Sequence, residues 1–267
     1  MDGKLRGVGA RQNIIRSWNS LHHFDAAAPG GIANAIAGKF VWTANGGMDT
    51  SAAQARFGAR SLIGDGAADF LSAPAFAASF ATPGSFFGTA DWTIDFWLRK
   101  LATDPEPVFT IWHDANNYFT IGGDAADAIV VYGIQGGVDI ANYTLAGATS
   151  GFVTNTWMRY MICRSGAALR IAVGQAAVNM QPYAWTASPT LLTAATTLTM
   201  NAAEVYHIGR ANAVYCTAAS FIDELRIVNG QALKLENMVN LTPWAAPAAA
   251  FSVDQAGSPN DNYNQTS

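Results

Sequence analysis

The stretch that decides the fold is DWTIDFWLRK, residues 91–100. Side chains on a β-strand point alternately to opposite faces, so residues two apart share a face. The two alternating sets in this stretch are Trp92, Ile94, Phe96 and Leu98, and Thr93, Asp95, Trp97 and Arg99. Because the first set is wholly apolar, the pattern predicts a half-buried strand of a large all-β domain.

The same alternation recurs further along the chain. Residues 155–175 (NTWMRYMICRSGAALRIAVGQ) contain two alternating runs separated by Arg164-Ser165-Gly166. A short polar turn with glycine between two such runs predicts a β-hairpin. Four further runs are spaced by turn residues, as expected of an antiparallel meander, and they cover residues 108–114, 118–123, 128–133 and 138–145.

Composition limits the class of protein. Of the 267 residues, 50% are hydrophobic and 13% are charged, which supports a large core and excludes a disordered chain. An all-β sandwich of this length commonly forms one domain. The formal charge of −4 argues against nucleic acid or a membrane surface as partner. No apolar run approaches the roughly 18 residues of a transmembrane helix, and no signal-peptide pattern occurs, so we expect folding in a cytoplasm-like compartment.

Six segments in a fixed order carry a resemblance to a known family. They are LHHFD (21–25), FVWTANGGMDTSAAQARFGARSLIGDGAADFLSAP (40–74), DWTIDFWLRK (91–100), NTWMRYMICRSGAALRIAVGQ (155–175), YHIGR (206–210) and SFIDELRIVNGQAL (220–233). Together they resemble the concanavalin A-like lectin/glucanase superfamily, and their order is most similar to laminin-G-like domains. The resemblance implies an antiparallel β-sandwich jelly roll over residues 18–244, with an N-terminal arm at 1–17 and a C-terminal tail at 245–267.

Two blocks narrow this resemblance. TANGG (43–47) and the segment beginning with FIDELRI (221–227) are similar to laminin-G-like domains in structural proteins of tailed bacteriophages, although Trp244 stands where that pattern usually carries a second proline. The resemblance implies a non-catalytic structural or adhesion protein on the virion surface, as a capsid decoration or tail component. Its expected partners are other virion proteins and further copies of itself.

Glycosidases on this fold require two carboxylates, about 5 Å apart in retaining enzymes. None of the four glutamates, Glu106, Glu204, Glu224 and Glu236, has a second carboxylate at a suitable strand spacing. Asp223 and Glu224 are adjacent, and adjacent strand residues face opposite ways. The sequence therefore predicts a protein that is not an enzyme. A glycosidase with a dispersed site at Glu106 and Glu204 is the least favoured alternative.

The main alternative to a virion structural role is a carbohydrate-binding module for host or environmental glycans. An aromatic ring offers an apolar surface to a sugar, and side-chain amides supply directional hydrogen bonds. The candidate residues are Trp97, Trp112, Asn116, Asn117 and Tyr118. Aromatic side chains in a two-layer fold are also core residues, so both roles stay open for them.

The resemblance also implies a structural calcium ion held by Asp25 in LHHFD and Asp223 in FIDELRI. Calcium takes six to eight oxygen ligands, so backbone carbonyls would have to complete the shell. In the alternative interpretation Asp25 begins a turn and Asp223 pairs with an arginine such as Arg226. The two cysteines, Cys163 and Cys216, are not expected to form a disulfide in a reducing compartment.

Overall fold

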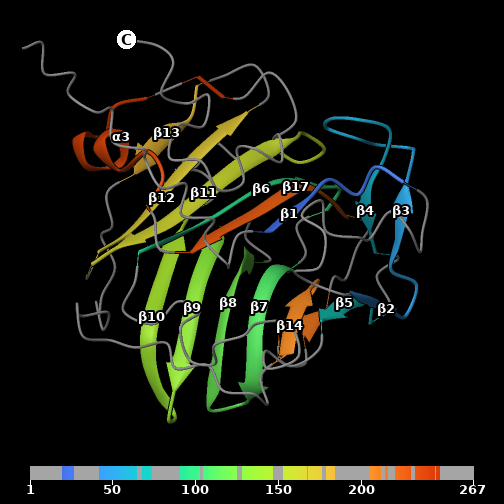
Figure 1. The fold of residues 1–267 in the computed structure, drawn as a ribbon, viewed down its shortest axis with the longest axis horizontal. Helices are drawn as coiled ribbons and strands as arrows, with labels where there is room; N and C mark the ends of the chain where they lie inside the picture. The colour runs from blue at the N-terminus through green and yellow to red at the C-terminus, as the bar shows by residue number, and fades with distance from the viewer. Residues whose placement is uncertain are drawn as a thin grey trace, which may run out of the picture.

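The computed structural model describes residues 20–26, 42–64, 68–73, 91–102, 105–124, 128–146, 153–166, 168–175, 179–183, 205–211, 214–215, 220–229, 232–243 and 245–246. These residues form two antiparallel sheets that pack face to face, with their strands crossing at an angle (Figure 1). The predicted arm, most of the predicted tail, Glu204, Cys216 and Trp244 lie outside the described residues.

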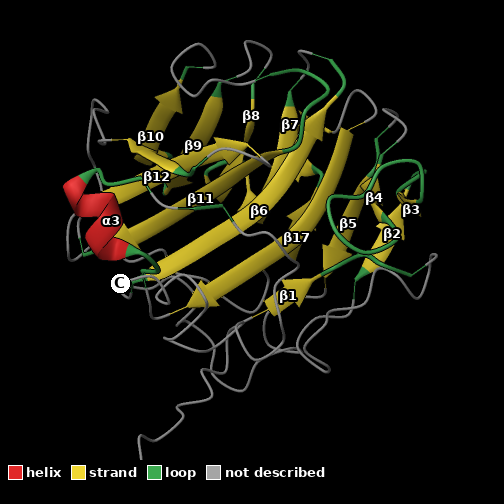
Figure 2. Ribbon diagram, turned by 90° about the horizontal axis from the view of Figure 1, so that it is seen from above, coloured by secondary structure: helices red, strands yellow, loops and turns green. Residues whose placement is uncertain are grey.

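The larger sheet, sheet A, has eight strands in the described part of the chain. In spatial order they are β13 (Gln181–Tyr183), β12 (Ala168–Gln175), β11 (Met158–Ser165), β6 (Trp92–Lys100), β17 (Ser220–Asn229), β4 (Ser61–Ile63) and β3 (Asp49–Ser51), while β1 (Ser20–His22) pairs with β17. A short helix, α3 (Leu235–Asn240), contacts β12 and β13. Figure 2 shows the helix beside β12.

The second sheet, sheet B, has seven strands in the same described ranges. Their spatial order is β10 (Val138–Leu145), β9 (Ile129–Gln135), β8 (Asn117–Gly123), β7 (Glu106–Asp114), β14 (Val205–Ile208), β5 (Phe70–Ala73) and β2 (Thr43–Asn45). A small hairpin of β15 (Arg210–Ala211) and β16 (Val214–Tyr215) lies beside β7. Among all of these residues, no helix is long and apolar enough to span a membrane.

The stretch that predicted the fold forms β6, near the middle of sheet A. It pairs with β11 on one side and β17 on the other. Ile94, Phe96 and Leu98 are fully buried between the sheets. The predicted hairpin is β11–β12, and the predicted meander is β7–β8–β9–β10. The predicted antiparallel β-sandwich is thus confirmed.

Aromatic side chains fill much of the space between the sheets. Trp92 of β6 meets Phe119 of β8 edge to face at 5.6 Å between ring centroids, which joins sheet A to sheet B. Such pairs contribute about 0.5–1.5 kcal/mol beyond the burial of their surface. Because Phe119 and Ile121 point into this core, the residues between and beside them on β8 point away from it.

Candidate functional site

Three aromatic side chains contact one another on the outer face of sheet B. Trp112 of β7 is the register partner of Tyr118 of β8, with 5.4 Å between their ring centroids. Tyr118 lies 5.8 Å from Tyr132 of β9. All three side chains are partly exposed. We call Trp112, Tyr118 and Tyr132 the aromatic ladder, since they cross three neighbouring strands.

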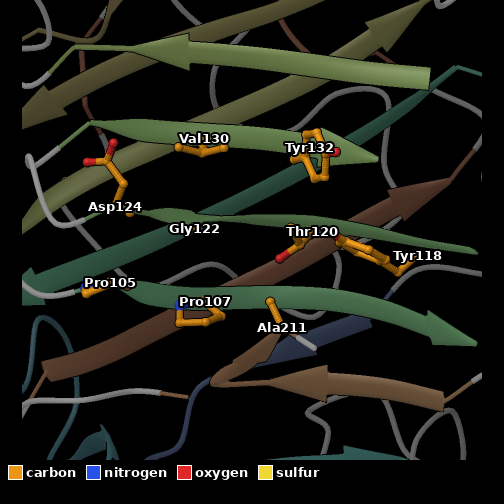
Figure 3. Close-up of a pocket in the computed structure, with 10 residues that line it drawn as sticks. Pro105, Pro107, Tyr118, Thr120, Gly122, Asp124, Val130, Tyr132 and Ala211 are labelled. Atoms are coloured by element: carbon orange, nitrogen blue, oxygen red, sulfur yellow. The ribbon is translucent and has the colours of Figure 1, made fainter. Parts of the chain in front are cut away.

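A hollow of about 280 Å³ lies beside the aromatic ladder (Figure 3). Pro107 and Ala211 form an apolar wall along one side, and Val130 lines the other. The two tyrosines of the ladder stand at one end of the hollow, and Asp124 stands at the opposite end.

Gly122 lines the hollow, and the structure leaves no room for a side chain at this position. Gly122 pairs with Pro107 next to a β-bulge in β7, between Pro107 and Phe109. The bulge brings the β7 backbone so close that a Cβ on Gly122 would lie 2.3 Å from the carbonyl oxygen of Glu106. Glycine often occupies a strand where another backbone approaches this closely. Gly122 therefore contributes only backbone to the lining of the hollow.

Fixed polar groups adjoin the exposed rings. The Tyr132 hydroxyl donates to Asp139 Oδ1 at 2.7 Å, and Asn142 Nδ2 donates to Asp139 Oδ2 at 3.3 Å. This hydrogen bond, followed by burial, raises the pKa of Tyr132 to about 12, so the phenol stays protonated. Thr120, which lines the hollow, shares a 2.8 Å hydrogen bond with the Thr110 hydroxyl. Hydroxyl and carboxylate groups are thus held in place beside apolar ring faces.

The two predicted asparagines lie at the end of the aromatic ladder, where Asn116 is in the β7–β8 turn and Asn117 begins β8. Asn117 Nδ2 donates to Asp114 Oδ1 at 3.0 Å, and Asn117 Oδ1 accepts from the Gly136 N–H at 2.9 Å. Both groups of this amide hold two neighbouring hairpin turns together. Asn116 is exposed, and its backbone N–H donates to Asp114 Oδ1 at 2.7 Å. The Asn117 and Asn116 hydrogen bonds lower the pKa of Asp114.

The structure separates Trp97 from the other predicted glycan contacts. Trp97 points away from the core, as the alternation predicted, but it lies on the outer face of sheet A and is 0% exposed. Phe57 packs edge to face against its ring at 5.9 Å, and the Arg56 guanidinium lies 4.4 Å from the ring centroid. The loop that carries Arg56 and Phe57 covers the ring. The expectation of an exposed Trp97 is wrong for this reason.

Asp25 and Asp223, the two residues expected to hold calcium, have backbone N–H groups as partners in the structure. Asp223 Oδ2 accepts from the backbone N–H groups of Arg56 and Phe57 at 2.9 and 3.1 Å. Asp25 Oδ1 accepts from the N–H of Ala59 at 3.0 Å. Calcium takes six to eight oxygen ligands, and the printed partners of these two carboxyl groups are N–H donors. Within the described ranges, no group of three or more His, Cys, Asp or Glu residues could hold a metal ion.

The two aspartates instead fasten one loop to the sandwich. Asp223 Oδ1 also accepts from the Glu224 N–H at 2.8 Å. Burial raises the pKa of Asp223 to about 8, although the Phe57 N–H opposes this shift. The alternative pairing of Asp223 with Arg226 is also wrong, because Arg226 Nη2 donates to Asp95 Oδ2 at 2.6 Å.

Of the two carboxylates proposed for a glycosidase, Glu106 lies among the described residues and Glu204 does not. Glu106 is 1% exposed, so a polysaccharide on the surface does not reach it. Glu224 is also buried and lies 2.5 Å from His23 Nδ1. Cys163 is a buried free cysteine whose thiol pKa is raised to about 12 by burial.

No family model matches the sequence, and no curated protein matches it. Solved structures do resemble the fold. Domain 4 of AbnA, a GH43 extracellular arabinanase from Geobacillus stearothermophilus, in complex with arabinotriose, has a TM-score of 0.53 and 13% identity, over 84% of this chain and 97% of that domain.

Two toxin domains resemble the fold to a similar extent. The binding domain of Paraclostridial Mosquitocidal Protein 1 has a TM-score of 0.53 and 12% identity, over 83% of this chain and 51% of that one. The Botulinum neurotoxin serotype G binding domain has a TM-score of 0.51 and 12% identity, over 85% and 50%. The chain therefore spans about half of each toxin domain and nearly all of the arabinanase domain. These likenesses establish the fold as an antiparallel β-sandwich shared with binding domains.

Proposed function

We propose that this protein is a non-catalytic carbohydrate-binding domain whose site is the aromatic ladder and the adjoining hollow. The observation that carries the proposal is that Tyr118 contacts both Trp112 and Tyr132 while all three rings remain partly exposed on a single sheet face. The arabinanase domain, which has the same type of fold, is described in complex with arabinotriose. That complex supports the proposal without assigning the same sugar to this chain.

The chemistry of the face suits a sugar. A sugar ring has apolar C–H surfaces that pack on aromatic rings, and a rim of hydroxyls that need fixed hydrogen-bond partners. The ladder supplies the rings, while Asp139 and Thr120 supply the partners. Pockets for drug-sized ligands generally span about 300–1,000 Å³. At about 280 Å³ the hollow lies just below this range, which suits a single sugar unit rather than a longer oligosaccharide. Neighbouring units of a chain would then pack along the ladder.

The predicted place on a tailed-phage virion stays a proposal that rests on sequence resemblance. A glycan-binding face is compatible with an adhesion role on a particle surface. Other virion proteins and further copies of this chain stay predicted partners on the same basis.

A glycan panel tests the proposed function directly. The full chain should bind at least one oligosaccharide saturably, as measured by isothermal titration calorimetry. Tyr118→Ala and Tyr132→Ala should each lower that affinity by about tenfold or more, equivalent to about 1.4 kcal/mol. Tyr183→Ala, in β13 of the other sheet, is the matched control and should keep the affinity. Unchanged affinity in both ladder variants, or no binding across the panel, would reject the proposal.

A further inference from the structure

We infer that the site selects uncharged glycans and discriminates against sugars that carry carboxylate or sulfate groups. This inference rests on the proposed function and adds the class of ligand. It begins with the charges around the site. Asp124 is the charged side chain among the described residues that line the hollow. Asp139 and Asp114 flank the aromatic ladder at two further points.

Hydrogen bonds within the protein hold each carboxylate in place. Asp124 Oδ1 accepts from the Ala128 N–H at 2.8 Å, which keeps this side chain at the end of the hollow. Asp139 is held by Tyr132 and Asn142. Burial raises the pKa of Tyr118, and the negative charge of Asp139 raises it further. The field of Asp139 therefore extends to the middle ring of the ladder.

The lysine, arginine and histidine side chains near the site contact other groups of the protein. Lys100 Nζ is buried beneath the sheet and donates to the Asp124 carbonyl oxygen at 2.9 Å. The Arg210 guanidinium lies over the Phe70 ring, 4.7 Å from its centroid. His113 is half-exposed and its Nε2 lies 3.5 Å from Asp114 Oδ2. An anionic sugar on this face would therefore meet carboxylates before it met a cation from the described part of the chain.

The same carboxylates favour neutral sugars. A sugar hydroxyl that donates to a carboxylate forms a charge-assisted hydrogen bond, which is stronger than one between neutral groups. A uronate, sialate or sulfate offers a like charge and is repelled. At low ionic strength we expect each nearby carboxylate to disfavour an anionic ligand by roughly threefold, the size of a partly solvated charge pair several ångströms apart. Salt should weaken this discrimination.

Matched pairs of ligands provide the test. Galactotetraose is compared with tetragalacturonate, and lactose with sialyllactose, within a panel that also holds arabinotriose and other neutral oligosaccharides. Affinities of the full chain are measured by calorimetry at ionic strengths of about 0.01 M and about 1 M. The neutral member should bind about tenfold more tightly at low salt, with a smaller ratio at high salt.

Charge-removing variants sharpen the test. Asp139→Asn and Asp124→Asn should each reduce the neutral-to-anionic ratio by roughly threefold at low salt. Asp49→Asn removes an exposed carboxylate from β3 of sheet A and is the matched control that should keep the ratio.

Three outcomes would each overturn either the inference or the proposed function, and they distinguish between the two. Equal or tighter binding of the anionic members overturns the inference while the proposed function stands. A neutral preference that responds neither to salt nor to the two aspartate variants also overturns it, because the carboxylates would not be its cause. No binding by any ligand, neutral or anionic, overturns the proposed function itself.

Discussion

The outer faces of the two sheets show the same alternation of residues but differ in their exposure to solvent. On sheet A, the outward residues Asp95, Trp97 and Arg159 are fully buried. On sheet B, the outward residues Tyr118 and Tyr132 are partly exposed beside a hollow. A period of two therefore identifies which residues share a face. It does not tell whether that face meets solvent.

The covered face has its own chemistry. Asp95 accepts from Arg159 Nε at 2.8 Å and Nη2 at 2.5 Å, and from Arg226 Nη2 at 2.6 Å. All three side chains are buried. An exposed ion pair contributes at most about 1 kcal/mol, whereas removing one partner of a buried pair leaves a charge uncompensated and is far more costly.

The largest expected effect follows from this contrast. Asp95→Ala should lower the free energy of unfolding by about 5 kcal/mol, because two buried guanidinium groups lose their shared carboxylate. Asp139→Ala, on the open face, should cost less than about 1 kcal/mol. Urea unfolding at neutral pH measures both. Similar losses in the two variants would show that the faces do not differ as described.

Truncating one aromatic side chain on each outer face compares the two faces by a change that removes no charge. Trp97→Ala should cost about 4 kcal/mol, since a fully buried indole leaves a cavity. Tyr118→Ala should cost about 1 kcal/mol, because its ring is already partly in water. The same unfolding experiment applies. A Trp97→Ala variant as stable as Tyr118→Ala would mean that the cover over sheet A contributes little.

The outer face of sheet B also has a buried part, at His207, and the stability of the protein should depend on pH because of it. His207 of β14 is 4% exposed, with its ring 5.2 Å from that of Phe70. Burial, together with the Arg210 charge, lowers the pKa of His207 to about 4. The unfolded chain binds this proton below pH 6.5 and the folded chain does not, so the contribution of His207 to stability is present above pH 6.5 and is lost as pH falls toward 4.

The expected loss is about 2 kcal/mol between pH 6.5 and pH 5, from about 1.4 kcal/mol for each pH unit. His22 acts in the same direction, since burial lowers its pKa to about 3. His207→Gln should flatten the decline of stability across this interval, measured by thermal unfolding at successive pH values. His113→Gln controls for the removal of a half-exposed histidine. An unchanged decline in His207→Gln would contradict the assigned role.

The smallest expected effect concerns calcium. Asp25 and Asp223 accept N–H bonds from the loop that covers Trp97. Adding calcium or a chelator should therefore leave the Tm unchanged. Asp223→Asn should lower the Tm, because both Asp223 oxygens accept backbone N–H bonds and the amide nitrogen of asparagine would face one of those donors. A Tm that rises with calcium in the wild-type chain and not in Asp25→Asn would restore the metal site.

The sequence was informative wherever the deciding contacts are local. β6, the β11–β12 hairpin and the β7–β10 meander follow from alternation and turns. Trp112 and Tyr118 were nominated together because they flank one tight turn. Tyr132 was missed, although Val130 and Tyr132 alternate in the same way, because joining it to Tyr118 requires the register of β8 on β9. The hollow lies beside a bulge in β7, and no pattern of residues in the sequence predicts that bulge.

The wrong expectations share a long-range cause. Trp97 is covered by a loop some 40 positions earlier in the chain, held by Asp223 from β17. Asp223 does not pair with Arg226, because a second bulge lies between the two residues. At this bulge Glu224 has a φ of 52°, and the register of β17 with β6 shifts. There Arg226 faces Asp95 across the pair of strands. Neither the loop over Trp97 nor the register shift at Glu224 can be inferred from the spacing of residues along one strand.

The crowding at Gly122 makes the hollow resistant to sequence drift. Any side chain there would collide with the neighbouring backbone, which cannot move aside as a flexible side chain could. The residues around the rim, including Asp124, Val130 and Ala211, already carry side chains and can be exchanged more freely. A side chain at Gly122 cannot be introduced without disturbing the sheet. The recess is thus tied to the backbone of the sheet, whereas the chemistry of its rim is not.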